Sequence, residues 1–243
     1  MKKNLPKRYF EVDALRGIAI IMMVVFHFLY NIKFLDISDL NLEEGFWMIF
    51  GRATAILFLL LVGVSLALSF ARTSNPIFKK YFKRGLKIFS WGLIITLVTW
   101  LLLKEGYVRF GILHLIGVTI VLAYPLMKYK YLNLLIGVVA ILIGIFVNEL
   151  SLSFPWLLWL GFMHDKLVYT VDYFPVLPWA GVILIGMFIG KLLYPDYKRS
   201  FPILNISNSS IIKALSYLGK HSLIIYLIHQ PIILFILFTI FRA

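Results

Sequence analysis

Long apolar stretches, separated by short polar connections, follow one another along almost the whole chain. A helix needs about 20 mostly apolar residues to cross a hydrocarbon layer about 30 Å thick, and about seven stretches approach that length. The predicted spans cover residues 14–32, 46–71, 86–103, 108–127, 131–147, 174–193 and 222–241. This pattern predicts an all-α integral membrane protein, a bundle of about seven transmembrane helices that forms a single domain over residues 1–243.

The composition agrees with a membrane protein. Hydrophobic residues make up 61% of the chain and charged residues 14%, against about 45–50% and about 25% in soluble domains. The mean hydropathy is +0.92. Because the chain has no Cys, disulfide scaffolds, thiolate zinc sites and cysteine nucleophiles are excluded.

The formal net charge of +13 is typical of proteins that bind nucleic acid, but the positions of the basic residues argue against that partner. If the N-terminus is cytoplasmic, most of the 24 Lys and Arg residues fall in cytoplasmic connections. Those that fall outside are Lys33, Lys104, Arg109, Lys166 and Arg242. An excess of Lys and Arg in cytoplasmic loops sets the orientation of membrane proteins. We therefore predict a cytoplasmic N-terminus, an external C-terminus, and a lipid bilayer instead of a nucleic acid as the partner.

Two shorter segments are predicted to lie at the membrane surface. Residues 78–87 are basic and aromatic, which is typical of an interfacial helix on the inner face. Residues 150–161 contain Trp156 and Trp159 and are too short to span, so we expect an interfacial or re-entrant segment on the outer face. We find no internal repeat, which weakens the interpretation as an inverted-repeat transporter.

Few ionisable side chains lie within the predicted spans or at their mouths: Arg16, His27, Arg52, His114, Asp172 and His229. Each costs at least about 2.5–3.5 kcal/mol in hydrocarbon, so each needs a functional or a structural reason. With a rise of about 1.5 Å per residue, most of them fall in the middle and outer half of the bilayer. We expect most to point into the bundle, although the histidines can also be hydrogen-bonding links between helices and the arginines can extend to the headgroups.

The sequence excludes several familiar site chemistries. No pair of histidines has the HxxxH or HExxH spacing, and we expect no metal. The chain has neither a Gly-rich phosphate loop nor a GxSxG nucleophile elbow. Among the familiar site chemistries, the one that remains is a histidine that acts as a base or nucleophile and is supported by an arginine.

Residues 13–27 carry a resemblance to known enzymes. Arg16 is followed by ten residues and then His27, which is the spacing found in the first helix of sugar O-acyltransferases. Further motifs lie in order at residues 58–65, 84–86, 110–117, 172–179, 186–190 and 218–231. Together they cover nearly the whole chain, which resembles the catalytic-domain family of heparan-α-glucosaminide N-acetyltransferase.

The resemblance implies an acyltransferase of the cell membrane. It would move an acetyl group from cytoplasmic acetyl-CoA to a sugar or glycan acceptor at the external side, by N- or O-acetyl transfer. In this interpretation His27 is a general base or a transient acetyl carrier. Arg52 or His114 stabilises the oxyanion, and Asp172 orients a histidine or binds acceptor hydroxyls. The side chains expected to line the acceptor site are His229, Gln230 and Trp179.

The charge distribution suits this donor. CoA is a cytoplasmic polyanion, and the predicted inner face offers five basic side chains to its phosphates. They are Arg16, Arg84, Lys87, Lys191 and Lys220.

The sequence leaves two other functions open. A proton-coupled transporter or flippase would also place histidines and arginines inside the membrane, although the chain has few intramembrane carboxylates. A non-catalytic scaffold would leave His27 and Arg52 without a purpose. The sequence leaves the oligomeric state open, with a homodimer as one option.

Overall fold

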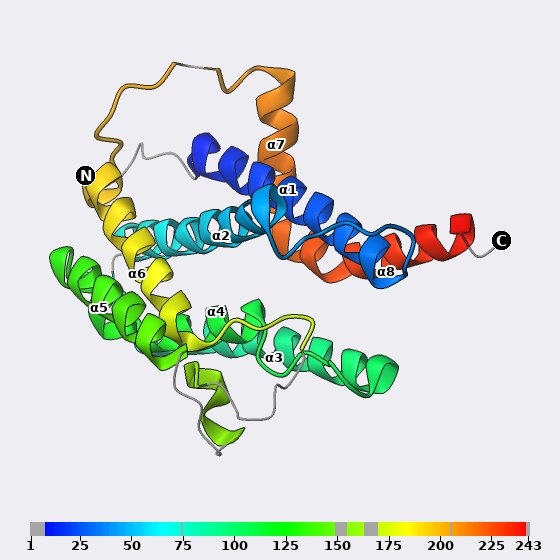
Figure 1. Cartoon of the computed structure of the whole chain (residues 1–243). Helices are drawn as coiled ribbons and strands as arrows, with labels where there is room; N and C mark the ends of the chain where they lie inside the picture. Colours follow the sequence, from blue (N-terminus) through cyan, green and yellow to red (C-terminus); the bar gives the residue numbers. More distant parts are fainter. Residues whose placement is uncertain (1–7, 74, 149–154, 163–169, 205, 242–243) are drawn as a thin grey trace. The chain divides into compact units, whose positions relative to one another are not determined.

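The structure is a computed structural model that describes residues 8–73, 75–148, 155–162, 170–204 and 206–241 (Figure 1). Within these residues it is all-helical, with isolated bridges but no β-strand. The α-helices are α1 (Phe10–Phe34), α2 (Gly45–Arg72), α3 (Phe78–Leu103), α4 (Ile112–Leu122), α5 (Tyr131–Asn148), α6 (Val176–Leu193), α7 (Ser210–Lys220) and α8 (Ser222–Phe241). The 3-10 helices are η1 (Tyr124–Lys128), η2 (Pro155–Leu160) and η3 (Pro195–Tyr197).

These helices confirm the predicted all-α integral membrane fold. Five of them, α1, α2, α3, α6 and α8, are long and apolar enough to cross a membrane, and α4 and α5 are shorter apolar helices. The count of seven spans and the orientation of the termini stay predictions. The predicted span 108–127 divides into α4 and η1, because Pro125 has no N–H for the helical ladder and disfavours helical geometry in the residue before it.

One sequence prediction is corrected by the structure. Residues 78–87 do not form a separate interfacial helix but are the first turns of the continuous helix α3. The structure also contains α7, which lies between the last two predicted spans and belongs to neither of them. Its eleven residues are too few to register as a span. Of the predicted outer segment, η2 is described and exposes Trp156 and Trp159, while residues 150–154 lie outside the described residues.

The described residues group into two compact units. The first contains the chain up to Leu61 and from Pro202 onward, and so includes α1, the first part of α2, α7 and α8. The second contains residues from Val62 to Phe201, with the rest of α2 and the helices α3 to α6.

In the first unit α1 packs against both α7 and α8 (Figure 1). The backbones of α1 and α7 approach closely at two glycines. A Cβ on Gly17 would lie 2.1 Å from the Leu215 carbonyl oxygen, and one on Gly219 would lie 1.8 Å from that of Asp13. Small residues commonly let membrane helices approach in this way. This contact fixes where α8 begins, because Ser222 follows α7 after a single residue.

The second unit uses the same kind of contact. α5 and α6 meet at Gly137 and Gly181, where each glycine lies against the backbone carbonyl of the other. α3 and α4 meet in the same way at Gly85 and Gly117. α6 also lies close to Gly63 in the second part of α2, through the Ile183 carbonyl.

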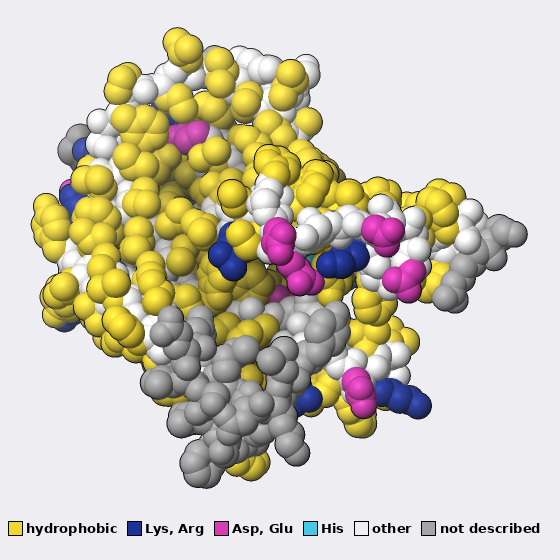
Figure 2. All heavy atoms as spheres, in the orientation of Figure 1, with side chains coloured by type: hydrophobic (Ala, Val, Ile, Leu, Met, Phe, Trp, Pro, Cys, Tyr) yellow, Lys and Arg dark blue, Asp and Glu magenta, His cyan; other side chains and the backbone are white. Residues whose placement is uncertain are grey.

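The surface of the molecule is predominantly apolar. Hydrophobic side chains cover most of the face seen in Figure 2. On α3 the exposed side chains include Leu93, Leu97 and Leu101. Monomeric soluble proteins rarely expose contiguous apolar surface on this scale, so we assign this surface to lipid.

The close approach of α1 and α7 generates a first prediction. Gly219→Ala should lower the stability of the protein by at least about 1–3 kcal/mol, because the new methyl group meets backbone atoms that cannot rotate away. The measurement is thermal unfolding in detergent, followed by tryptophan fluorescence. Ala214→Leu is the matched control, since it adds more volume at an exposed position of the same helix. Equal midpoints for the two variants would show that α7 does not pack on α1 in this way.

Candidate functional site

The side chains of His27 and His229 meet in the first unit. His27 lies on α1 and His229 on α8, with their ring centroids 4.8 Å apart and the ring planes at 79°. His229 is buried and His27 half-buried. Packing of α8 along α1 therefore brings together two histidines that are separated by most of the chain.

The hydrogen bonds of the two rings define which nitrogen carries the proton. Nδ1 of His27 lies 2.9 Å from the Met23 carbonyl oxygen, and Nδ1 of His229 lies 2.6 Å from that of Tyr226. A carbonyl oxygen only accepts, so Nδ1 is the N–H donor in both rings and Nε2 carries the lone pair of the neutral form. Among the described residues Nε2 of His229 has no hydrogen-bond partner. Two imidazolium ions this close would repel strongly, so the two rings cannot both carry an added proton.

A second polar pair lies next to the histidines, with Asn31 one helical turn after His27 and Gln230 directly after His229. Nδ2 of Asn31 donates to Oε1 of Gln230 at 2.7 Å, and Asn31 is 4% exposed. Gln230 was predicted from the sequence, but Asn31 was missed. Its position four residues after His27 on the same helix face was the available signal. The seam between α1 and α8 thus presents imidazole and amide groups side by side.

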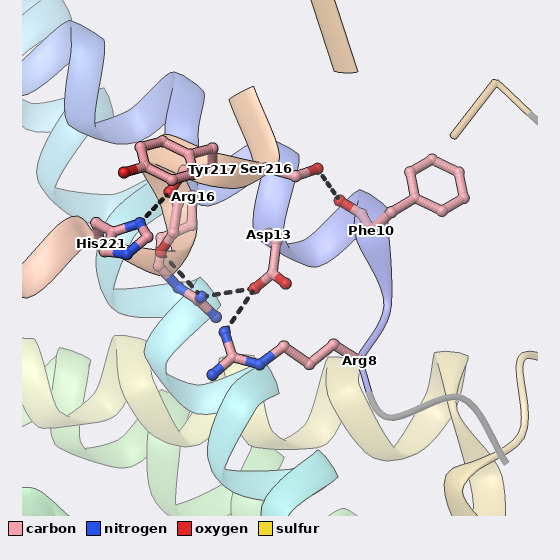
Figure 3. A network of polar contacts seen from close by, with 8 residues as sticks. Arg8, Phe10, Asp13, Arg16, Ser216, Tyr217 and His221 are labelled. Carbon is pink, nitrogen blue, oxygen red and sulfur yellow. Dashed lines mark hydrogen bonds and ion pairs between the residues drawn. The ribbon is translucent and has the colours of Figure 1, made fainter. Parts of the chain in front are cut away.

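Near its start, α1 holds a buried ion pair (Figure 3). The Arg16 guanidinium donates to Oδ1 of Asp13 at 3.0 Å and to the Gly219 carbonyl at 3.3 Å. Arg8 approaches the same carboxylate oxygen at 3.9 Å from a side chain that is 60% exposed. A cation is favourable at the last carbonyls of a helix such as α7. Arg16, predicted to bind phosphate, therefore also joins α1 to α7.

The other predicted residues of the first unit are exposed. Lys220 is the last residue of α7 and its side chain is exposed. Arg52 is exposed on α2 and makes no hydrogen bond or ion pair within the described part of the chain. Neither side chain is held in one position by a neighbour, so each is able to turn toward a ligand.

His114 and Asp172 come together in the second unit, at the N-terminus of α4. Nδ1 of His114 accepts the Gly111 N–H at 3.2 Å, and its Nε2 lies 3.5 Å from the Thr96 hydroxyl. The ring lies against Phe89 and Phe110 and is 2% exposed. Oδ2 of Asp172 accepts the Ile112 N–H at 3.3 Å, where a carboxylate stabilises the helix dipole.

Tyr173 helps to hold the segment that carries Asp172. Its hydroxyl donates to the Leu158 carbonyl at 2.7 Å, and burial raises the pKa of Tyr173 to about 12. The phenol therefore stays protonated and donating at physiological pH.

The remaining residues that were predicted to bind acetyl-CoA or the acceptor substrate also lie in the second unit. The Lys191 ammonium donates to the Met127 carbonyl and lies 5.8 Å from the Phe70 ring centroid. Arg84 and Lys87 are exposed on the first turns of α3. Trp179 packs on Phe174 with ring centroids 4.9 Å apart. In the part of the chain described, no group of three or more His, Asp or Glu is placed to hold a metal ion.

Comparison with known proteins identifies the family. The model of the family described as "heparan-alpha-glucosaminide N-acetyltransferase, catalytic" matches residues 8–231. The chain belongs to this family. No curated protein and no solved structure matches it.

Family membership confirms the resemblance found in the sequence. The match extends over both His27 and His229, and the apolar helices agree with a multi-pass membrane protein. The protein is therefore a membrane acetyltransferase in general terms, and family membership does not favour the transporter interpretation.

The buried ion pair of this family member generates a second prediction. Arg16→Ala should destabilise the protein by about 3–5 kcal/mol, because it leaves the buried Asp13 carboxylate without its main partner. Arg8→Ala should cost less than about 1 kcal/mol, since Arg8 is a solvent-exposed partner of the same carboxylate. Thermal unfolding in detergent compares the two. A loss of similar size in both variants would contradict the central place of Arg16.

Proposed function

We propose that this member of the family transfers an acetyl group from cytoplasmic acetyl-CoA to a sugar or glycan acceptor at the external side of the cell membrane. The observation that carries the proposal is the His27–His229 pair, in which each Nδ1 is occupied by a backbone carbonyl and each Nε2 is left for chemistry. His27 is the reacting histidine, because it is the less buried of the two.

His27 can act in either of two ways. As a general base, Nε2 takes the proton of an acceptor hydroxyl or amine while that group attacks the thioester carbonyl; the C–S bond then breaks, and the imidazolium returns the proton to the leaving CoA sulfur. As a carrier, Nε2 attacks the thioester carbonyl first, the C–S bond breaks and CoA leaves as the thiolate. The acceptor then attacks the acetylated imidazole, the C–N bond breaks, and the acceptor proton passes to the CoA thiolate. A positioned base typically contributes about 10²–10⁴ in rate, and a covalent intermediate divides one difficult step into two easier ones.

The groups around His27 support both routes. His229 presents a second unprotonated Nε2 beside the first ring, because that nitrogen is buried without a hydrogen-bond partner in the described chain. Gln230, held through its oxygen by Asn31, has amide N–H groups for the acceptor or for the developing oxyanion. One such donor is worth about 3–4 kcal/mol in the transition state.

The other predicted catalytic residues receive different roles in this proposal. Arg52 has an uncommitted guanidinium and is assigned to the oxyanion. His114 and Asp172 are assigned to positioning, because their hydrogen bonds go to the first turn of α4. Trp179 lies in the second unit, packed on Phe174, and its assignment to the acceptor site rests on the sequence resemblance alone.

Acetyl-CoA is assigned to the cytoplasmic face, where its phosphates would meet Lys220 and Arg16. Arg84, Lys87 and Lys191 contribute further positive charge to that face. Exposed Lys220 is the most available of the set in the first unit.

The predicted orientation is compatible with the packing of the first unit. α1 and α8 run in the same direction, since Arg16 lies near Gly219 at their starts and His27 meets His229 further along. Parallel spans require an odd number of membrane crossings between them. The five spans predicted between them meet this condition.

His27→Ala tests the proposal directly. Transfer of radiolabel from acetyl-CoA to an amino sugar should fall about 10²–10⁴-fold, because the variant lacks the base or carrier. Thermal unfolding should stay close to that of the unaltered protein. His221→Ala is the matched control, because that ring is partly exposed and bonds to its own helix at Tyr217, and it should retain transfer.

The same assay separates the two routes. Rapid denaturation in cold detergent at neutral pH, where an acetylimidazole survives longest, should leave label on the protein if His27 carries the acetyl group, and none if it acts only as a base. Undiminished turnover in a folded His27→Ala variant would exclude both roles.

Lys220→Glu tests the donor site. Reversal of one charge at a phosphate contact should raise the KM for acetyl-CoA about tenfold and leave the KM for the acceptor unchanged, since a hydrogen bond to a charged group is worth about 1.5–3 kcal/mol. Lys104→Glu, at the predicted external side, is the charge-matched control. An unaltered KM for acetyl-CoA would place the donor phosphates elsewhere.

A further inference from the structure

The short helix α7 has one face that is fixed to α1. Ser216 donates to the Phe10 carbonyl at 3.3 Å, and Leu215 and Gly219 lie against the backbone of α1 at Gly17 and Asp13. These three α7 residues share one side of the helix, following its i, i+3 and i+4 spacing. The rotation of α7 about its own axis is therefore set by α1.

The fixed rotation leaves two other faces of α7 uncovered. One is apolar and carries Ile211, Ala214 and Leu218, at the i, i+3 and i+7 spacing of a single stripe. Ile211 is 71% exposed, Ala214 is exposed and Leu218 is half-buried. The other face carries Lys213 and Lys220, seven residues apart and both exposed.

The position of α7 coincides with the start of two spans. It crosses the first turns of α1 (Figure 1) and is followed directly by α8. Both α1 and α8 are long and apolar enough to cross a membrane. At about 1.5 Å per residue, the eleven residues of α7 extend only about 16 Å, which is too short to span. A helix at this level lies where hydrocarbon gives way to headgroups.

We propose that α7 is seated in an anionic membrane surface. Its stripe of Ile211, Ala214 and Leu218 enters the boundary of the acyl chains, and Lys213 contacts the anionic lipid headgroups. Apolar and basic faces on one helix are the combination that binds such surfaces. Lys220 shares the basic face, but the test uses Lys213 because Lys220 is assigned to CoA. Through its joint with α8, this seat also fixes the level of His229 in the bilayer.

The absence of Cys from the chain makes a site-specific test clean. Ile211→Cys and Lys213→Cys, each labelled with an environment-sensitive fluorophore, are placed in nanodiscs of phosphatidylcholine with or without phosphatidylglycerol. The label at 211 should be quenched by nitroxides on the acyl chains and protected from aqueous iodide. The label at 213 should show the reverse. Neither measurement depends on enzymatic activity, so the result stands apart from the proposed function.

A second variant tests the charge. In the Ile211→Cys background, Lys213→Gln should lower the ratio of protected to iodide-accessible label about fivefold in phosphatidylglycerol nanodiscs, the equivalent of about 1 kcal/mol for one lysine near an anionic surface. Lys104→Gln, far from α7 in sequence and exposed, should leave the ratio unchanged. The proposal is overturned if iodide reaches both labels equally, or if Lys213→Gln has no effect in anionic lipid. Protection of label 211 from both quenchers would also overturn it, since a protein surface would then cover the stripe.

Discussion

Polar groups inside a membrane must find their partners within the protein, because hydrocarbon offers none. At the seam between α1 and α8, several polar side chains meet that constraint with short hydrogen bonds. Nδ1 of His27 and Nδ1 of His229 each bond to a carbonyl of their own helix, and the Asn31 amide bonds to Gln230 across the seam. What these contacts leave over is Nε2 of each imidazole. The same requirement that stabilises the helices thus presents the reactive nitrogens.

The two histidines owe their meeting to contacts made elsewhere in the first unit. Gly17 and Gly219 allow α7 to lie directly on α1, and the Arg16 guanidinium joins Asp13 to the end of α7. α8 starts immediately afterwards, so this joint fixes its origin. Local packing at the ends of three helices therefore defines the geometry of a site about ten residues away along both α1 and α8.

The two buried histidines, His114 and His229, differ in the hydrogen bonds that their ring nitrogens make. His114 uses Nδ1 to accept an N–H at the start of α4 and directs Nε2 toward a threonine hydroxyl. His229 keeps Nε2 without a partner among the described residues. Both histidines are buried, with His114 2% exposed and His229 6% exposed. The hydrogen-bonding geometry is what separates a structural histidine from a candidate reactive one.

The membrane class and most helix positions could be predicted from the sequence, because the length and polarity of each apolar stretch are local properties. His27 and its spacing from Arg16 could also be identified in that way. Other features depend on contacts between distant segments. The sequence did not reveal α7 or the role of Asn31. It placed His27, His114, Asp172 and His229 at similar depths in the bilayer but could not show which of them are in contact.

Only the tertiary structure decided which polar residues meet, because a helix face is defined by its neighbours. It pairs His27 with His229 across α1 and α8, and places His114 with Asp172 at the start of α4. The depth of a residue in the bilayer can be predicted by counting residues along its helix. The rotation of that helix about its own axis depends on packing against its neighbours. The sequence therefore determined the kind of protein and its candidate chemical groups, and packing selected the partners.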